Sequence, residues 1–241
     1  MSTMRIGIRG WRYWASGVPM GARWSDWITG DVRPDGDSIP PLSELPAIHR
    51  RRLSPLARTA FYCAKGCLEG AVPIATVFSS AHGEIKRSMK LLEGIASGGG
   101  VSPAAFSLSV HNSIAGLFTI YDGHTSPSVS IAAGHEGLGA AFVTGASLVS
   151  EQGAGPVLIV CFDEPLPESV PRGCESPPAI MAAAFLLCPN SPQFLLEREP
   201  TRAEAPMAHW DQIRHLVAFL DSPQTQCSLV SSRAEWTWTR L

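Results

Sequence analysis

Hydrophobic and polar positions are arranged most regularly in the middle of the chain. Val129 and Ile131 lie two positions apart, which is typical of a strand. From Gly137 to Ser150 the chain has no charged residue and its apolar positions keep helical spacing, so this stretch predicts a buried helix. Pro156 to Phe162 is also uncharged and predicts a fully buried strand. The pattern therefore predicts a strand, a tight turn, a buried helix and another buried strand in succession.

The same reasoning predicts elements on either side of this stretch. Ser54 and Pro55 mark the start of a helix that ends near Gly70, because Ser is a favoured N-cap and Pro suits the first helical position. Other periodic segments predict strands over Arg5 to Arg9, with Ile6 and Ile8 on one face, and over Pro73 to Ser79. A strand pair is predicted over Ala179 to Leu187 and Gln193 to Leu196, and a final edge strand contains Trp236 and Trp238. Helices are predicted over Glu84 to Ala96, with Ile85, Met89, Leu92 and Ile95 inward, and over Met207 to Leu220. The predicted class is α/β.

A second segment, Ala104 to Gly116, is almost free of charge and predicts another helix without a charged face. Only 17% of all residues are charged, which is below the usual quarter for a globular protein. Two helices without a charged face would expose apolar surface to water unless another protein covers them. The composition therefore favours a permanent protein partner.

Length and charge exclude several classes of function. With 241 residues, of which 45% are hydrophobic, the chain suits one globular domain over residues 1–241. The net charge of -2 offers no footprint for nucleic acid or for an anionic membrane. The sequence contains no segment with the character of a membrane span and no apolar leader at its start, so we expect a cytoplasmic protein.

Cysteine and histidine spacing predicts neither a metal site nor a bound cofactor. The six cysteines have no C-x-x-C pair, and in a chain of this length we expect buried reduced thiols. The seven histidines include no H-E-x-x-H motif, and no phosphate-binding glycine motif or G-x-S-x-G elbow occurs.

The turn before the central helix is where α/β enzymes often hold a nucleophile, because a helix N-terminus stabilises negative charge. Here the turn contains His135 and Glu136, and it has no Cys or Ser. Two interpretations stay open. Either residue could act as a base in a reaction, or both are simply polar residues of a first helical turn, where Glu is favoured.

Several stretches resemble the N-terminal half of the β-ketoacyl synthases, which have the thiolase-like fold. They are L-P-A-I-H-R-R-R-L-S-P-L-A-R, V-S-P-A-A-F-S-L-S-V-H-N-S-I-A-G-L-F-T-I-Y-D-G, S-P-S-V-S-I-A-A-G-H-E-G and G-A-G-P-V-L-I-V-C-F-D-E, within about Pro46 to Glu164. Active synthases carry a Thr-Ala-Cys signature in the third stretch. Aligned on Ser130 and Ile131 the family's Cys falls on His135, and counted back from Gly153 it falls on Glu136, so the thiol is missing in either case.

The resemblance implies a thiolase-like half-fold, with a mixed sheet and helices on both faces around one buried central helix. The family's H-G-T-G-T-like and G-F-G-G-like motifs are absent, so residues 1–241 correspond to the N-terminal half of a full synthase. The chain is similar to the short ketosynthase-like proteins known as chain length factors in aryl polyene clusters of Gram-negative bacteria. Such a subunit has no catalytic residue or cofactor of its own, pairs with an active ketosynthase, and serves elongation of chains held on acyl carrier protein.

By the same resemblance, five residues are expected at the partner interface beside the acyl tunnel: Val110, His111, Asn112, Phe118 and Tyr121. The first alternative is a stand-alone acyl-thioester hydrolase or decarboxylase that uses His135 or Glu136 as its base. The second alternative is a scaffold or binding protein without an enzymatic partner.

Overall fold

The computed structural model describes residues 2–18, 24–29, 38–73, 75–151, 155–171 and 174–241. Its elements in chain order are β1 (Ser2–Ile6), β2 (Ile8–Ala15), α1 (Trp24–Thr29), α2 (Ala47–Arg50), α3 (Pro55–Leu68), β3 (Ala75–Ser79), α4 (Ile85–Ala96), α5 (Pro103–Ser107), α6 (Ser113–Asp122), β4 (Ser128–Ile131), the short 3-10 helix η1 (Gly134–Glu136), α7 (Gly137–Glu151), β5 (Val157–Asp163), β6 (Met181–Leu187), β7 (Phe194–Pro200), α8 (His209–Leu220), β8 (Gln226–Val230) and β9 (Ala234–Arg240).

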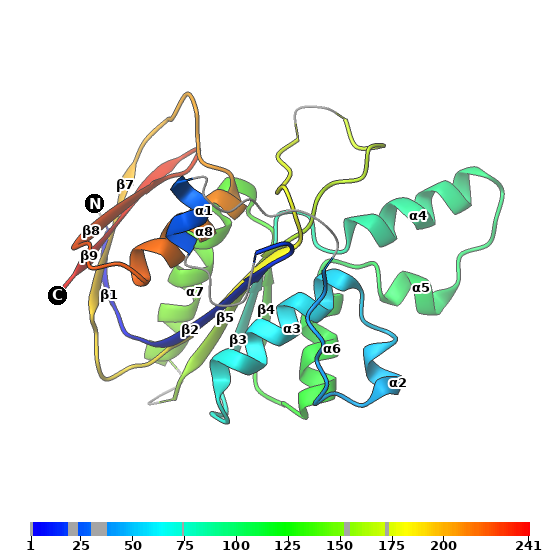
Figure 1. Ribbon diagram of the computed structural model, residues 1–241, viewed down its shortest axis with the longest axis horizontal. Helices are drawn as coiled ribbons and strands as arrows, with labels where there is room; N and C mark the ends of the chain where they lie inside the picture. The colour runs from blue at the N-terminus through cyan, green and yellow to red at the C-terminus, as the bar shows by residue number, and fades with distance from the viewer. Residues whose placement is uncertain (1, 19–23, 30–37, 74, 152–154, 172–173) are drawn as a thin grey trace.

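The strands form two sheets with helices between and beside them (Figure 1). The larger sheet has the order β2-β6-β5-β3-β4 and is mixed, because β3 is parallel to β4 and β5 whereas β6 is antiparallel to its neighbours. The smaller sheet has the order β1-β7-β9-β8 and is antiparallel. Helices α7 and α8 lie between the sheets, and α3 and α6 cover the outer face of the larger one. A mixed sheet with helices on both faces is thereby confirmed.

Strand β5 lies at the centre of the larger sheet and every one of its residues is buried, as its uncharged sequence predicts. Its side chains alternate between the two faces. Leu158 and Val160 belong to the core under α3 and α6, whereas Ile159 and Cys161 belong to the core under α7 and α8.

Helix α3 begins as its sequence predicts. Pro55 is the first helical residue, and the Ser54 hydroxyl accepts a hydrogen bond from the Ala57 backbone N–H at 2.9 Å. The central helix α7 is buried over its first turns, where Leu138 and Phe142 are fully enclosed, whereas Ser147 and Ser150 near its far end are exposed.

Three strand predictions are wrong, one in the extent of a strand and two in how strands pair. Ile6 and Ile8 belong to two strands of different sheets, because the chain changes sheet at Gly7, where a Cβ would come within 2.6 Å of the Cys188 carbonyl oxygen. Strands β6 and β7 are not paired with each other, since β6 joins the larger sheet and β7 the smaller. The last strand, β9, is not an edge strand but lies between β7 and β8.

The predicted inward face of residues 84–96 is also wrong. Helices α4 and α5 form an arm that projects from the body of the protein (Figure 1), and Leu92 and Ile95 on α4 are 57% and 52% exposed. The segment Ala104 to Gly116 is not one helix, because the chain breaks it into α5 and α6. No described helix has the length and apolar character needed to cross a membrane.

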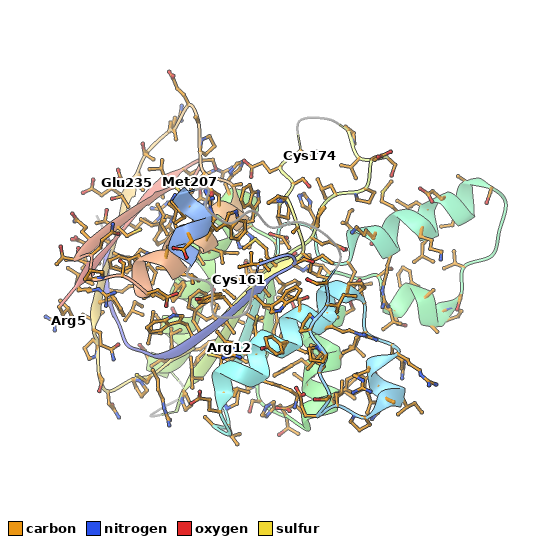
Figure 2. The ribbon with its side chains drawn as sticks, in the orientation of Figure 1. Arg5, Arg12, Cys161, Cys174, Met207 and Glu235 are labelled. Carbon is orange, nitrogen blue, oxygen red and sulfur yellow. The ribbon has the colours of Figure 1, made fainter. Side chains whose placement is uncertain are left out.

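The six cysteines are free thiols, and their environments differ. Cys161 is buried in the larger sheet, whereas Cys174 is exposed in the loop that follows β5 (Figure 2). The prediction of buried thiols is confirmed for Cys63, Cys67 and Cys161, fails at Cys174, and holds only in part for Cys188 and Cys227.

Candidate functional site

His135 and Glu136 lie in η1, between the end of β4 and the start of α7, so the structure places them at the predicted turn. The two side chains point to different partners. His135 Nδ1 is 3.2 Å from the Met207 carbonyl oxygen and 3.4 Å from Glu175 Oε1. Burial raises the pKa of the Glu175 carboxyl, although the neighbouring histidines, His135 first among them, act to lower it.

Glu136 fastens the turn between β8 and β9. Its carboxylate accepts hydrogen bonds from the Ser231 hydroxyl at 2.8 Å, the Ser232 hydroxyl at 3.2 Å and the Arg233 backbone N–H at 2.9 Å. These three donors hold the Glu136 carboxylate on the turn between β8 and β9. This geometry favours a structural role for Glu136.

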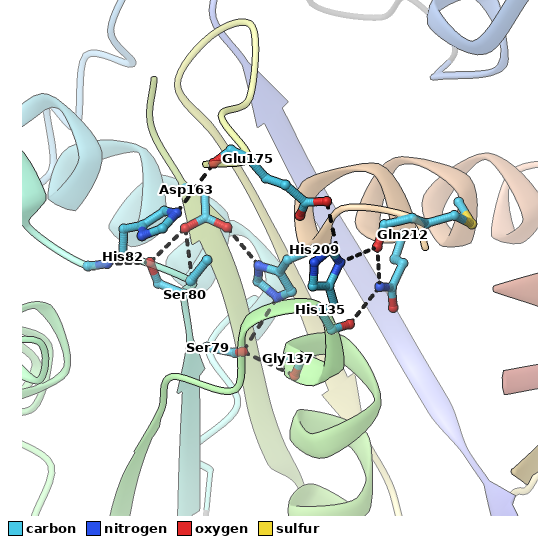
Figure 3. A network of polar contacts seen from close by, with 12 residues as sticks. Ser79, Ser80, His82, His135, Gly137, Asp163, Glu175, His209 and Gln212 are labelled. Carbon is cyan, nitrogen blue, oxygen red and sulfur yellow. Dashed lines mark hydrogen bonds and ion pairs between the residues drawn. The ribbon is translucent and has the colours of Figure 1, made fainter. Parts of the chain in front are cut away.

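Directly beneath the turn, Ser79, Asp163 and His209 form a linear array of polar contacts (Figure 3). Asp163 Oδ2 is 2.7 Å from His209 Nδ1, and His209 Nε2 is 3.5 Å from Ser79 Oγ. The Ser79 hydroxyl also donates to the carbonyl oxygen of Gly137, the first residue of α7, at 3.1 Å. A hydroxyl, an imidazole and a carboxylate in this order are the arrangement of a nucleophile, a base and a group that orients the base.

The second oxygen of Asp163 is held by the chain that follows β3. Its Oδ1 accepts from the Ser80 hydroxyl at 2.8 Å and from the Ala81 backbone N–H at 2.9 Å. The same segment binds His111, whose Nε2 is 3.0 Å from the Ser80 carbonyl oxygen. The carboxylate therefore has a fixed orientation toward His209.

The array is closed to solvent in the isolated chain. Ser79 has no exposed surface, and Asp163 and His209 are each 2% exposed. A Cβ on Gly137 would lie 2.7 Å from the His209 ring and 3.1 Å from Ser79 Oγ, so the first residue of α7 covers the pair at close range. The more exposed contact between His135 and Glu175 lies above them (Figure 3).

The sequence did not predict this array, although its pattern held a usable indication. Ser79 is the last residue of one predicted buried strand and Asp163 directly follows another. Since β3 and β5 are parallel neighbours, their carboxyl ends meet at one edge of the sheet. The position of His209 depends on how α8 returns to that edge, which no local pattern predicts.

The five residues expected at a partner interface have different environments. Val110 is partly buried and Asn112, just before α6, is exposed. Tyr121 is partly buried, with its ring 4.3 Å from that of His49. Phe118 has no exposed surface, because it packs in the chain's own core against Phe61, with ring centroids 5.2 Å apart.

Phe118 therefore presents no surface to a partner, whereas Ile120 on the same helix is 72% exposed. Among the residues that the structure describes, no three His, Cys, Asp or Glu side chains gather in a way that would hold a metal ion.

A comparison with protein-family models decides the family. The model of the β-ketoacyl synthase N-terminal domain matches residues 24–239. The chain belongs to this family. No curated protein sequence matches it.

Solved structures agree on the fold. A chain of the complex between the ketosynthase ApeO and its chain length factor ApeC from Xenorhabdus doucetiae is 24% identical, with a TM-score of 0.85 over 98% of this chain and 100% of that one. A chain of the AntDE:AntF complex, a type II PKS acyl-carrier protein with its ketosynthase, is 12% identical, with a TM-score of 0.68 and both chains fully covered. A chain of the ishigamide ketosynthase/chain length factor is 14% identical, with a TM-score of 0.59 over 82% of this chain and 68% of that one. This ketosynthase-like chain therefore has the thiolase-like fold.

Proposed function

We propose that this chain is a non-catalytic ketosynthase-like subunit, of the chain-length-factor type, which pairs with an active β-ketoacyl-ACP synthase in the elongation of polyene chains. The observation that carries the proposal is the turn between β4 and α7. In this family the condensing thiol stands at that turn, and here η1 holds His135 and Glu136 instead. Without a thiol the turn forms no acyl-thioester intermediate, so the partner must supply the nucleophile.

Unpartnered surfaces of the described chain support a protein partner. β4 ends the larger sheet and pairs with β3 alone, which leaves backbone groups along its other edge open to another strand. Large apolar side chains are exposed on the arm and on α6, namely Leu92, Ile95, Phe106 and Ile120. Monomeric proteins seldom leave such groups in water, and a permanent partner covers them.

We further propose that α6 and the segment before it face the partner's acyl tunnel. Val110, His111 and Asn112 lie between α5 and α6, and Ile120 is on the exposed side of α6. A wider tunnel end should admit a longer chain, so Ile120→Ala or Val110→Ala should lengthen the products of the reconstituted pair. An unchanged product distribution for both variants contradicts this part of the proposal.

Pairing is tested by co-expression with an active β-ketoacyl-ACP synthase from the same organism. We expect co-purification in a 1:1 complex, measured by size-exclusion chromatography with light scattering, and poor solubility of this chain alone. Leu92→Asp should prevent assembly, because a charge would be buried against the partner. Val72→Asp is the matched control, since Val72 is 69% exposed and lies outside the arm, and it should leave assembly intact. A monodisperse monomer that never co-purifies contradicts the proposal.

The alternative with His135 as a general base is supported only by the contact of that ring with Glu175. It predicts turnover of acyl or malonyl thioesters by the purified chain, and loss of that turnover in His135→Ala. The proposal of a non-catalytic subunit predicts that His135→Ala changes nothing in this assay.

A further inference from the structure

We propose that Ser79, His209 and Asp163 form a second reactive site, separate from the turn that has lost the family's thiol, and that Ser79 is a nucleophile toward acyl esters and thioesters. This hydrolytic activity is separate from chain elongation, in which the chain supplies no nucleophile. Its chemistry is hydrolytic release of an acyl group through an acyl-serine, and the substrate class is a carboxylic thioester or ester.

Three contacts in the structure support the proposal. His209 Nε2 lies 3.5 Å from Ser79 Oγ, and the Ser79 proton points to the Gly137 carbonyl oxygen, so rotation of the hydroxyl is needed to bring the proton to Nε2. His209 Nδ1 is 2.7 Å from Asp163 Oδ2, so the carboxylate orients the ring. Asp163 is itself held through Oδ1 by the Ser80 hydroxyl and the Ala81 backbone N–H. Each group thus has the support that its role in the chemistry requires.

Burial at this site is costly for a purely structural element. Three polar side chains from β3, β5 and α8 are almost completely removed from water in a region that apolar residues would fill at lower cost. Position 137 is a glycine, and a Cβ there would lie 2.7 Å from the His209 ring. Both features preserve the same contact between a serine and a histidine.

Helix α7 adds an electrostatic element. It begins at Gly137, where a Cβ would lie 3.1 Å from Ser79 Oγ, so the N-terminal turn of a helix of 15 residues lies beside the nucleophile. A positive helix end next to a carbonyl under attack stabilises the negative charge that forms on its oxygen.

The reaction balances with water as the only co-reactant. The Ser79 hydroxyl first turns its proton from the Gly137 carbonyl oxygen to His209 Nε2, and Oγ then forms a bond to the acyl carbon while that proton passes to Nε2. The carbon–sulfur bond then breaks, and the departing sulfur takes that proton and leaves as a thiol. A water molecule attacks the acyl-serine, gives its proton to His209 and releases the carboxylic acid as the serine oxygen regains a proton.

The site is covered by Gly137, so reactivity requires the first turn of α7 to move away from Ser79. A small probe tests both the nucleophile and this access. The full chain, alone and in the co-purified complex, is treated with a fluorophosphonate, which forms a stable adduct with an activated serine, and the adduct is located by tandem mass spectrometry. We expect the adduct on Ser79, and not on the exposed Ser147 of α7.

Two variants separate a reactive site from a structural one. His209→Gln should slow labelling of Ser79 about 10²-fold or more, because the general base is lost. Asp163→Asn should also slow it, and thermal unfolding checks that both variants stay folded. Ser79→Cys gives a further readout if either variant unfolds, since an activated thiol at this position should react with iodoacetamide faster than Cys174.

The proposal is overturned if no adduct forms on Ser79 in either preparation, or if His209→Gln labels at the rate of the native chain. Labelling and complex formation are measured separately. Failure of pairing therefore leaves this inference standing, and failure of labelling leaves the proposed pairing standing.

Discussion

The array of Ser79, Asp163 and His209 under α7 and the arm of α4 and α5 differ in which side chains they bury. Under the first residue of α7, Ser79, Asp163 and His209 are buried, and Asp163 is paired with His209 at 2.7 Å. On the arm, apolar side chains such as Leu92 and Phe106 are exposed and unmatched. A protein that worked alone would be expected to cover its apolar groups and expose its reactive ones. We propose that another chain covers the arm, and that Ser79 becomes reactive only when the first turn of α7 moves away from it.

The largest expected effect is a loss of stability in Phe118→Ala. Phe118 is fully buried against Phe61 and Phe78, so the variant should lose about 3–5 kcal/mol of unfolding free energy. Phe106→Ala is the matched control, because Phe106 on the arm is 57% exposed and should change stability by about 0.5 kcal/mol or less. Urea unfolding measures both, and equal losses would contradict the contrast between core and arm.

The next largest effect concerns close packing between α7 and the smaller sheet. A Cβ on Gly139 would lie 2.3 Å from the buried ring of Trp236, so Gly139→Ala should cost about 1–3 kcal/mol through overpacking. Gly116→Ala on α6 is the control, since no atom lies within 4 Å of its Cβ position and alanine favours the helix. Thermal unfolding should show a lower midpoint for Gly139→Ala and a higher one for Gly116→Ala. An unchanged midpoint for Gly139→Ala would contradict the tight contact.

The smallest expected effect is a pH dependence of stability that arises from two buried carboxyls at the base of the arm. Burial raises the pKa of the Glu84 and Glu164 carboxyls above the ordinary 4.5, although Ser54 and Arg87 lower it for Glu84 and Lys86 lowers it for Glu164. A carboxyl whose pKa is higher in the folded than in the unfolded chain adds to the free energy of unfolding. This contribution is fully present below the unfolded pKa and is lost as pH rises through the folded pKa.

The unfolding midpoint of the native chain, relative to Glu164→Gln, should therefore fall as pH rises from about 4.5. Glu93→Gln, on the exposed part of α4, is the control and should give no such trend. A relative midpoint that rises over the same range would have the wrong sign for a buried carboxyl.

Local patterns predicted the elements that depend on neighbouring residues. The uncharged run of β5, the Ser54 cap of α3 and the turn at His135 all follow from sequences of a few residues. The resemblance to β-ketoacyl synthases gave the family, which the match over residues 24–239 confirms.

What the sequence could not predict depends on contacts between distant segments. His209 meets Asp163 across 46 positions and Ser79 across 130, so no local period relates them. The pairing of β9 with two strands has the same cause. For α4, amphipathic spacing predicted an apolar face correctly, but it could not tell whether this chain or another one covers Leu92 and Ile95.

The most direct test of the central claim is chain elongation by the reconstituted pair. One variant replaces this chain's His135 by alanine, and the other replaces the partner's nucleophilic cysteine by alanine. Product formation from malonyl and acyl groups on acyl carrier protein is measured for each. We predict unchanged elongation for His135→Ala and none for the partner variant. Elongation that stops in His135→Ala, or persists without the partner's cysteine, would contradict a non-catalytic subunit.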